Sequence, residues 1–175
     1  MVGTIPTSIS NLTRLTHLRI ISNKHLIGTV PGTVFTNMTD LVELSLAENN
    51  LNGTISDTID HLVHLEELIL AGNQFSGHIP PSLANITTLK IITLEDNLLS
   101  GMIPDTWENL QSLEIFNVPS NLLSGPLPHS LCQIKNISRI NAWTNGLQGT
   151  VPACFGNLPF LKQLQGGQLP QLWGN

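Results

Sequence analysis

Residues 65–88 read LEELILAGNQFSGHIPPSLANITT, and residues 89–112 read LKIITLEDNLLSGMIPDTWENLQS. Counted from the first leucine, both stretches have apolar residues at places 1, 4, 6, 11, 15, 19 and 22, asparagine at place 9, glycine at place 13 and proline at place 16. This spacing fits neither the 3.6-residue period of a helix nor the alternation of a single strand. It predicts a coil that turns once in every 24 residues.

The same division extends over almost the whole chain. The full coils are residues 41–64, 65–88, 89–112, 113–136 and 137–160. A coil with two extra residues covers 15–40, a partial repeat covers 1–14, and a degenerate repeat covers 161–175, where Leu169 replaces the asparagine. We predict one domain over residues 1–175. Because a repeat stack needs capped ends, we expect a fragment or a piece that another protein caps, with a complete short protein as the alternative.

Each coil is predicted to begin with a short strand that ends at an asparagine. Places 1 to 8 alternate like a short strand, with places 4 and 6 pointing inward and places 3, 5 and 7 pointing outward. An asparagine amide both donates and accepts hydrogen bonds, so stacked copies can satisfy the backbone where the chain leaves the strand. This predicts an asparagine ladder, formed by Asn23, Asn49, Asn73, Asn97, Asn121 and Asn145.

The pattern LxxLxLxxNxLxGxIPxxLxxLxx resembles the plant-type leucine-rich repeat, over roughly residues 3 to 164. The resemblance implies an α/β solenoid, a right-handed horseshoe or superhelix with a parallel β-sheet on its concave side. It also implies 3₁₀ or irregular turns on the convex side and a second short sheet near LxGxIP. Receptor-like kinases, receptor-like proteins and polygalacturonase-inhibiting proteins are the most similar members. They usually carry cysteine-bearing caps, which neither end of this sequence has.

The composition of the chain and the motifs that it lacks exclude several classes of function. The chain carries a net charge of −5 with seven Lys plus Arg and no basic run, so we expect no nucleic-acid partner. No apolar stretch approaches the ~18 residues that span a bilayer, and the N-terminus lacks the pattern of a signal peptide. Nucleophile, phosphate-binding and cofactor motifs are missing as well, so we expect no enzyme and no cofactor.

Two pairs of residues have side chains of the types that bind metals. His61 and His64 fall at places 21 and 24, on the turn into the next strand and without a third ligand, so we expect no zinc there. Cys132 and Cys154 fall at places 20 and 18 of consecutive coils, both on the convex side. A disulfide between them is conceivable, but two separately buried thiols are the favoured interpretation.

The outward strand places predict a mixed concave face. Acidic residues gather in its first half and middle, isoleucines lie across it, and Arg139 and Trp143 end it. The predicted partner-binding residues are Arg19, Glu43, Glu48, Glu67, Ile69, Ile91, Glu95, Asp96, Ile115, Asn117, Arg139, Asn141 and Trp143. In water-like dielectric Glu43 and Glu67 repel by about 1 kcal/mol at most, a cost that a basic partner would reverse. A solvated acidic surface is the alternative.

The tryptophans differ by register. Trp107 stands at place 19, a core place, whereas Trp143 stands at place 7 and should point outward. An outward tryptophan suits an interface anchor, because it buries a large area with few rotors to fix. The alternative is that Trp143 lies flat on Arg139 or Pro119.

Glycosylation sequons occur at Asn11, Asn37, Asn52, Asn85 and Asn136. None lies at strand places 1 to 8, so glycans would leave the concave face bare. This favours an extracellular or cell-surface location, with a cytoplasmic one as the alternative.

The combined hypothesis is a module that recognises a protein or peptide, with basic or mixed character, as part of a receptor-like or inhibitor-like extracellular protein. One alternative is a structural scaffold subunit that docks in a larger assembly. Another is ice binding, which favours columns of one small polar residue. Such a column is not apparent at place 5, which reads Arg19, Ser45, Ile69, Thr93, Asn117 and Asn141. The oligomeric state stays open.

Overall fold

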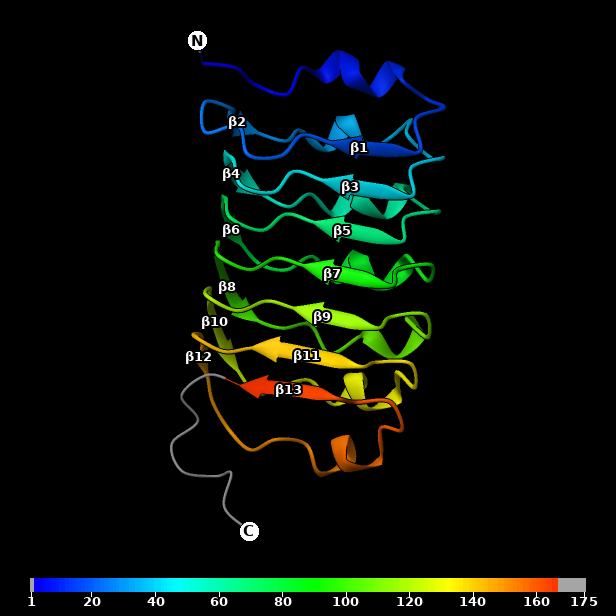
Figure 1. Ribbon diagram of the computed structural model, residues 1–175, viewed down its shortest axis with the longest axis vertical. Helices are drawn as coiled ribbons and strands as arrows, with labels where there is room; N and C mark the ends of the chain where they lie inside the picture. Colours follow the sequence, from blue (N-terminus) through cyan, green and yellow to red (C-terminus); the bar gives the residue numbers. More distant parts are fainter. Residues whose placement is uncertain (1, 167–175) are drawn as a thin grey trace.

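The computed structural model describes residues 2–166, in which the chain winds into a stack of coils (Figure 1). Each full coil adds one strand to a first sheet, one strand to a second sheet and one 3₁₀ helix between them. Strands of neighbouring coils pair in parallel. The solenoid with a parallel sheet, which the resemblance implies, is confirmed.

The first sheet has seven strands in chain order, which we call the concave sheet. Paired residues are 24 positions apart from β3 onward, as in Glu43 with Glu67, whereas His17 pairs with Glu43 across the longer first coil. The strands are β1 (His17–Arg19), β3 (Glu43–Ser45), β5 (Glu67–Ile69), β7 (Ile91–Thr93), β9 (Ile115–Asn117), β11 (Arg139–Ala142) and β13 (Gln163–Gly166).

The second sheet is formed by the segment around the glycine of each coil, near LxGxIP, where the resemblance placed it. It has six parallel strands in chain order. These are β2 (Ile27–Thr29), β4 (Asn50–Thr54), β6 (Gln74–Gly77), β8 (Leu98–Met102), β10 (Leu122–Gly125) and β12 (Gly146–Leu147).

Short 3₁₀ helices form the convex side, mostly directly after a proline that fixes φ at the entry. They are η1 (Thr7–Asn11), η2 (Gly32–Val34), η3 (Asp57–His61), η4 (Pro81–Asn85), η5 (Trp107–Asn109), η6 (His129–Gln133) and η7 (Ala153–Asn157). Ser56 replaces the proline before η3, and its hydroxyl accepts a hydrogen bond from the Thr58 N–H at 3.3 Å. Between residues 2 and 166, no helix is long and apolar enough to cross a membrane.

The inward places build one continuous core. In the coil of residues 65–88, the residues at the seven apolar places expose 3% of their surface or less; they are Leu65, Leu68, Leu70, Phe75, Ile79, Leu83 and Ile86. Trp107 is fully buried, as its register predicts. Burial of an apolar surface of this extent is the main force that holds the coils together.

The asparagine ladder is confirmed and links each coil to its neighbours. Asn73 accepts a hydrogen bond from the Leu51 N–H at 3.1 Å and donates one to the Leu46 carbonyl at 2.8 Å. The chain reaches each ladder asparagine through a residue of positive φ, a backbone state that side chains disfavour. These residues are Ser22, Glu48, Gly72, Asp96, Ser120 and Thr144. Leu169, predicted to end the ladder, lies outside the described residues.

Candidate functional site

The concave face is formed by the side chains on either side of each inward strand residue. In β5 the inward Leu68 is fully buried, whereas Glu67 and Ile69 flank it and are partly exposed. The same alternation repeats in each three-residue strand, although Glu43 and Ser45 on either side of Leu44 in β3 are themselves buried. All thirteen residues predicted to bind a partner therefore lie on this face or within three residues of the end of one of its strands.

Arg19 and Glu43 form a bidentate ion pair at the N-terminal end of this face. The Nε and Nη2 atoms of Arg19 donate to the two carboxylate oxygens of Glu43. The hydrogen bond from Arg19 holds the pKa of Glu43 below its ordinary value, although burial of the carboxylate acts in the opposite direction. The side chain of Glu43 is only 8% exposed. The repulsion expected between Glu43 and Glu67 is thus largely offset within the chain, and Glu43 offers little surface to a partner.

The remaining acidic side chains lie around the middle of the sheet. Glu48 accepts a hydrogen bond from the Ser22 hydroxyl at 2.9 Å, and Glu95 accepts one from the Asn117 amide at 2.6 Å. Within residues 2–166, Glu67 and Asp96 have no side-chain hydrogen bond or ion pair. Because no close ion pair or hydrogen bond in this part of the chain neutralises them, they are the carboxylates best placed to meet a cation.

The isoleucines of the face lie beside these acids. Ile91 and Ile115 pair directly on β7 and β9, whereas Ile69 lies opposite Thr93 in the next column. All three are partly exposed. The strip is therefore diagonal across the sheet, and it adds apolar contact area next to Glu67.

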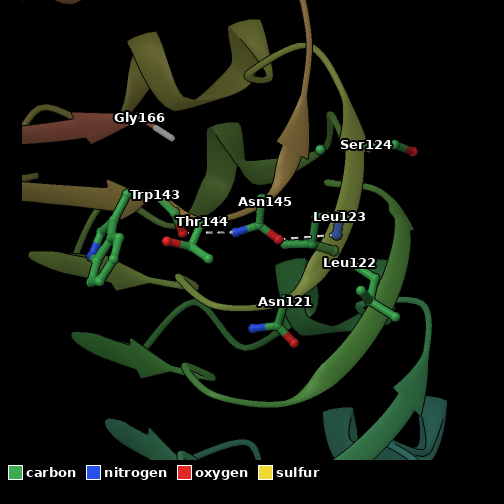
Figure 2. A pocket seen from close by; sticks show the side chains of 9 residues that line it. Asn121, Leu122, Leu123, Ser124, Trp143, Thr144, Asn145 and Gly166 are labelled. Atoms are coloured by element: carbon green, nitrogen blue, oxygen red, sulfur yellow. Dashed lines mark hydrogen bonds between the residues drawn. The ribbon is translucent and has the colours of Figure 1, made fainter. Parts of the chain in front are cut away.

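Trp143 marks the C-terminal end of the face. Its side chain points outward as predicted and is 48% exposed. A hollow of about 780 Å³ is lined by Trp143, Leu122 and Gly166, together with the ladder residue Asn145 (Figure 2). A second hollow of about 490 Å³ borders Trp143 beside Leu164. Among residues 2–166, the indole ring therefore has free space next to it.

Arg139 and Asn141 precede Trp143 on β11. Arg139 is exposed, but Asn141 is only 9% exposed although its register points it outward. It pairs with Asn117 on one side and Gln165 on the other. Neighbouring side chains cover it, so Asn141 contributes little accessible surface to the face.

The sequence prediction missed two features. Leu98 and Leu122 are 49% and 63% exposed at the start of their strands in the second sheet. Apolar residues at place 10 of two consecutive coils were the available signal. The second feature is a disulfide between Cys132 and Cys154. The interpretation as two separate thiols was wrong, because η6 and η7 stack with these Cα atoms 5.7 Å apart, within disulfide range.

Comparison with protein-family models gives two matches. A model described as "Leucine rich repeat" matches residues 13–75, and one described as "Leucine Rich Repeat" matches residues 88–110. Together with the coil geometry, these matches decide the family. The chain is a leucine-rich-repeat protein of the plant type. No curated protein sequence matches this repeat protein significantly.

Several solved structures are similar to the repeat protein. The plant peptide hormone receptor RGFR1 in complex with RGF2 is 36% identical, with a TM-score of 0.90 over 94% of this chain and 26% of that one. The Arabidopsis receptor kinase HAESA in complex with the peptide hormone IDA and the co-receptor SERK1 is 31% identical, with a TM-score of 0.91 over 96% and 28%. A structure of PEPR1–AtPEP1 is 30% identical, with a TM-score of 0.87 over 94% and 23%.

The repeat protein thus spans about a quarter of the length of these three receptor chains. The matched segments are leucine-rich repeats, an interaction fold without catalytic machinery. These matches support the prediction that the repeat protein is not an enzyme.

Proposed function

We propose that the repeat protein recognises an extended peptide or a protein segment across its concave sheet, as part of a receptor-like extracellular protein. A ligand that lies across the strands meets the acidic residues first and reaches Trp143 at the far end. Its basic groups would lie near Glu67 and Asp96, and an apolar group would contact the indole ring of Trp143. Because charged contacts lie at one end of the face and an apolar contact at the other, they would both fix the orientation of the ligand and add to its affinity.

The observation that carries the proposal is the pair of carboxylates without a partner in the described chain. Glu67 lies on β5 and Asp96 lies three residues after the neighbouring strand β7, with Ile69 and Ile91 on the same two strands. The similar structures support the ligand class, since RGFR1 is a peptide hormone receptor in complex with RGF2 and HAESA is in complex with a peptide hormone. Their ligands are properties of those proteins.

Charge reversal at the two carboxylates tests the proposal. A displayed library of random twelve-residue peptides is selected on the unmodified protein, and the enriched peptides are measured against the double variant Glu67→Lys with Asp96→Lys. We expect enriched peptides to be basic and to lose at least about tenfold in affinity, with a loss that shrinks as salt rises. Fluorescence anisotropy of the labelled peptides measures both effects.

The matched control is Asp40→Lys with Glu108→Lys. Both residues are exposed and lie outside the concave sheet, so this variant changes the net charge equally without touching the face. We expect it to keep at least half of the affinity. Equal losses in the two double variants would show that net charge, rather than the concave face, attracts the peptides.

The proposed extracellular location makes a separate prediction. All five sequon asparagines are exposed and none lies in the concave sheet, and the disulfide is of a kind that persists in oxidising compartments. In a secreting eukaryotic host, we expect glycans on Asn11, Asn37, Asn85 and Asn136, with lower occupancy at Asn52, whose backbone pairs within β4. Enzymatic deglycosylation followed by mass spectrometry measures occupancy, and secreted protein of unmodified mass would contradict the prediction.

The other hypotheses find less support. The columns of the concave sheet mix charged, polar and apolar side chains, whereas ice binding favours one small polar residue throughout. No specific observation in residues 2–166 favours docking as a scaffold subunit. We therefore keep peptide or protein recognition as the proposed function.

A further inference from the structure

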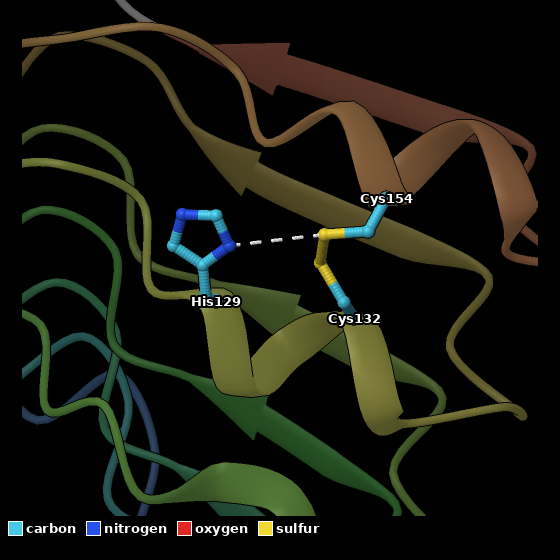
Figure 3. Close-up of side chains that lie close together, drawn as sticks. All are labelled: His129, Cys132 and Cys154. Atoms are coloured by element: carbon cyan, nitrogen blue, oxygen red, sulfur yellow. Dashed lines mark hydrogen bonds between the residues drawn. A yellow bond between two sulfur atoms is a disulfide. The ribbon is translucent and has the colours of Figure 1, made fainter.

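Three side chains with metal-binding atoms converge on the convex side, away from the concave sheet. They are His129 and Cys132 of η6 and Cys154 of η7 (Figure 3). The Nδ1 atom of His129 lies 3.9 Å from the Sγ atom of Cys154, which is bonded to Cys132. One imidazole nitrogen and both sulfurs all lie within 4.8 Å of one another.

The repeat geometry explains why these residues meet. A 3₁₀ helix has three residues per turn, so side chains three apart project on the same side. His129 and Cys132 have this spacing in η6, and η7 of the next coil presents Cys154 to them. The convergence therefore follows from two stacked turns whose backbone positions are set by the core.

Solvent and small molecules can reach this cluster. His129 is exposed, and both cysteines are partly exposed. A groove of about 620 Å³ opens beside Cys132, lined by Gln111, Lys135 and Asn157 among others. A reductant and a metal ion both have a route to the sulfur atoms.

We propose that reduction of the Cys132–Cys154 disulfide converts this cluster into a Zn²⁺ site with His129 as the third protein ligand. A tertiary phosphine and one water molecule reduce the disulfide to two thiols and give the phosphine oxide; two molecules of a monothiol give one external disulfide instead. Zn²⁺ then replaces the two thiol protons, which are released to solvent. Water fills the fourth coordination position, as in zinc sites with three protein ligands.

The distances suit this coordination. Tetrahedral zinc with ordinary bond lengths sets about 3.8 Å between two sulfurs and about 3.6 Å between sulfur and nitrogen. The imidazole is already near the second value, at 3.9 Å from Cys154. The sulfurs reach the first value by rotating apart once their bond is cleaved. Asp105 accepts a hydrogen bond from the Ser130 N–H at 2.7 Å and so holds the first turn of η6, which carries His129, in place.

Zinc titration of the whole chain in its two redox states tests the site. The protein is reduced with a water-soluble phosphine, freed of it under anaerobic conditions, and titrated with Zn²⁺ against a chromophoric chelator. We expect one tightly bound Zn²⁺ per reduced chain and at least about 100-fold weaker binding by the oxidised chain. Substitution by Co²⁺ should give thiolate-to-metal charge-transfer absorption and the visible bands of a tetrahedral site.

The variant His129→Ala distinguishes a zinc site that includes the imidazole from zinc binding by the two thiols alone, because it keeps both cysteines. We expect the reduced variant to bind Zn²⁺ at least about 100-fold more weakly, while the oxidised variant keeps the thermal midpoint of the unmodified protein. His61→Ala is the matched control, since His61 is also an exposed histidine of a 3₁₀ helix, and it should bind as the unmodified chain does. Equal affinity of reduced His129→Ala and the unmodified reduced protein would overturn the assignment, as would equal binding by both redox states.

Discussion

Replacing Asn97 with alanine should lower the free energy of unfolding by about 3 kcal/mol, because one buried donor loses its only partner. Asn97 is 6% exposed, and its Oδ1 atom accepts a hydrogen bond from the Phe75 N–H at 3.0 Å. Its amide nitrogen donates to the carbonyls of Leu70, Leu94 and Glu95 at 3.0 to 3.1 Å. Removing the side chain ends all four hydrogen bonds at once.

The four partners are not affected equally. The Leu70 carbonyl keeps a hydrogen bond from the amide of Asn73, and the Leu94 carbonyl keeps one from Asn121. The Glu95 carbonyl keeps the Gly72 N–H. Only the Phe75 N–H is left buried and unpaired, so most of the expected loss arises there, with a smaller share from the cavity and the weakened carbonyl contacts.

Chemical denaturation followed by circular dichroism measures the loss. Asn157→Ala is the matched control, because Asn157 is exposed and its side chain makes no hydrogen bond within residues 2–166. We expect the control to stay within about 0.5 kcal/mol of the unmodified protein. If both variants lose the same stability, the ladder does not stabilise the stack as argued.

The ladder was predictable because the repeat brings residues at the same place of successive coils next to one another, although they are 24 or 26 positions apart in the sequence. Once every coil is aligned, asparagine at place 9 must stack on asparagine. The same alignment assigns Trp107 to the core and Trp143 to the outer surface, although both are tryptophans. Both assignments are confirmed by burial, since Trp107 is fully buried and Trp143 is 48% exposed. Register therefore predicts on which side of the coil a residue lies.

Register does not predict how far a side chain is covered by its neighbours. Glu43 and Asn141 were assigned outward places, but Arg19 pairs with the first, and residues of adjacent strands flank the second. These outcomes depend on rotamers of residues in neighbouring coils. The same limit applied to Cys132 and Cys154, which register places on adjacent turns without deciding whether their sulfur atoms meet.

Replacing Trp107 with alanine should lower the free energy of unfolding by about 4 kcal/mol, the largest effect that we predict for a single side chain. Trp107 is fully buried in η5, and its ring lies 5.5 Å from that of Phe116, measured between centroids. An alanine leaves a cavity that the close-packed core around it cannot close completely. The loss should appear in the denaturation midpoint of the oxidised protein.

Trp107→Phe provides the comparison, because it keeps an aromatic ring beside Phe116 and removes the indole N–H. That N–H is buried without a hydrogen-bond partner in residues 2–166. Replacing Trp107 with phenylalanine therefore also removes the free-energy cost of burying an unpaired polar group. We expect Trp107→Phe to cost about 1 kcal/mol, well below the alanine variant. Equal losses in the two variants would mean that the indole N–H has a partner such as a buried water, and that lost hydrogen bonding, rather than the cavity, sets the cost.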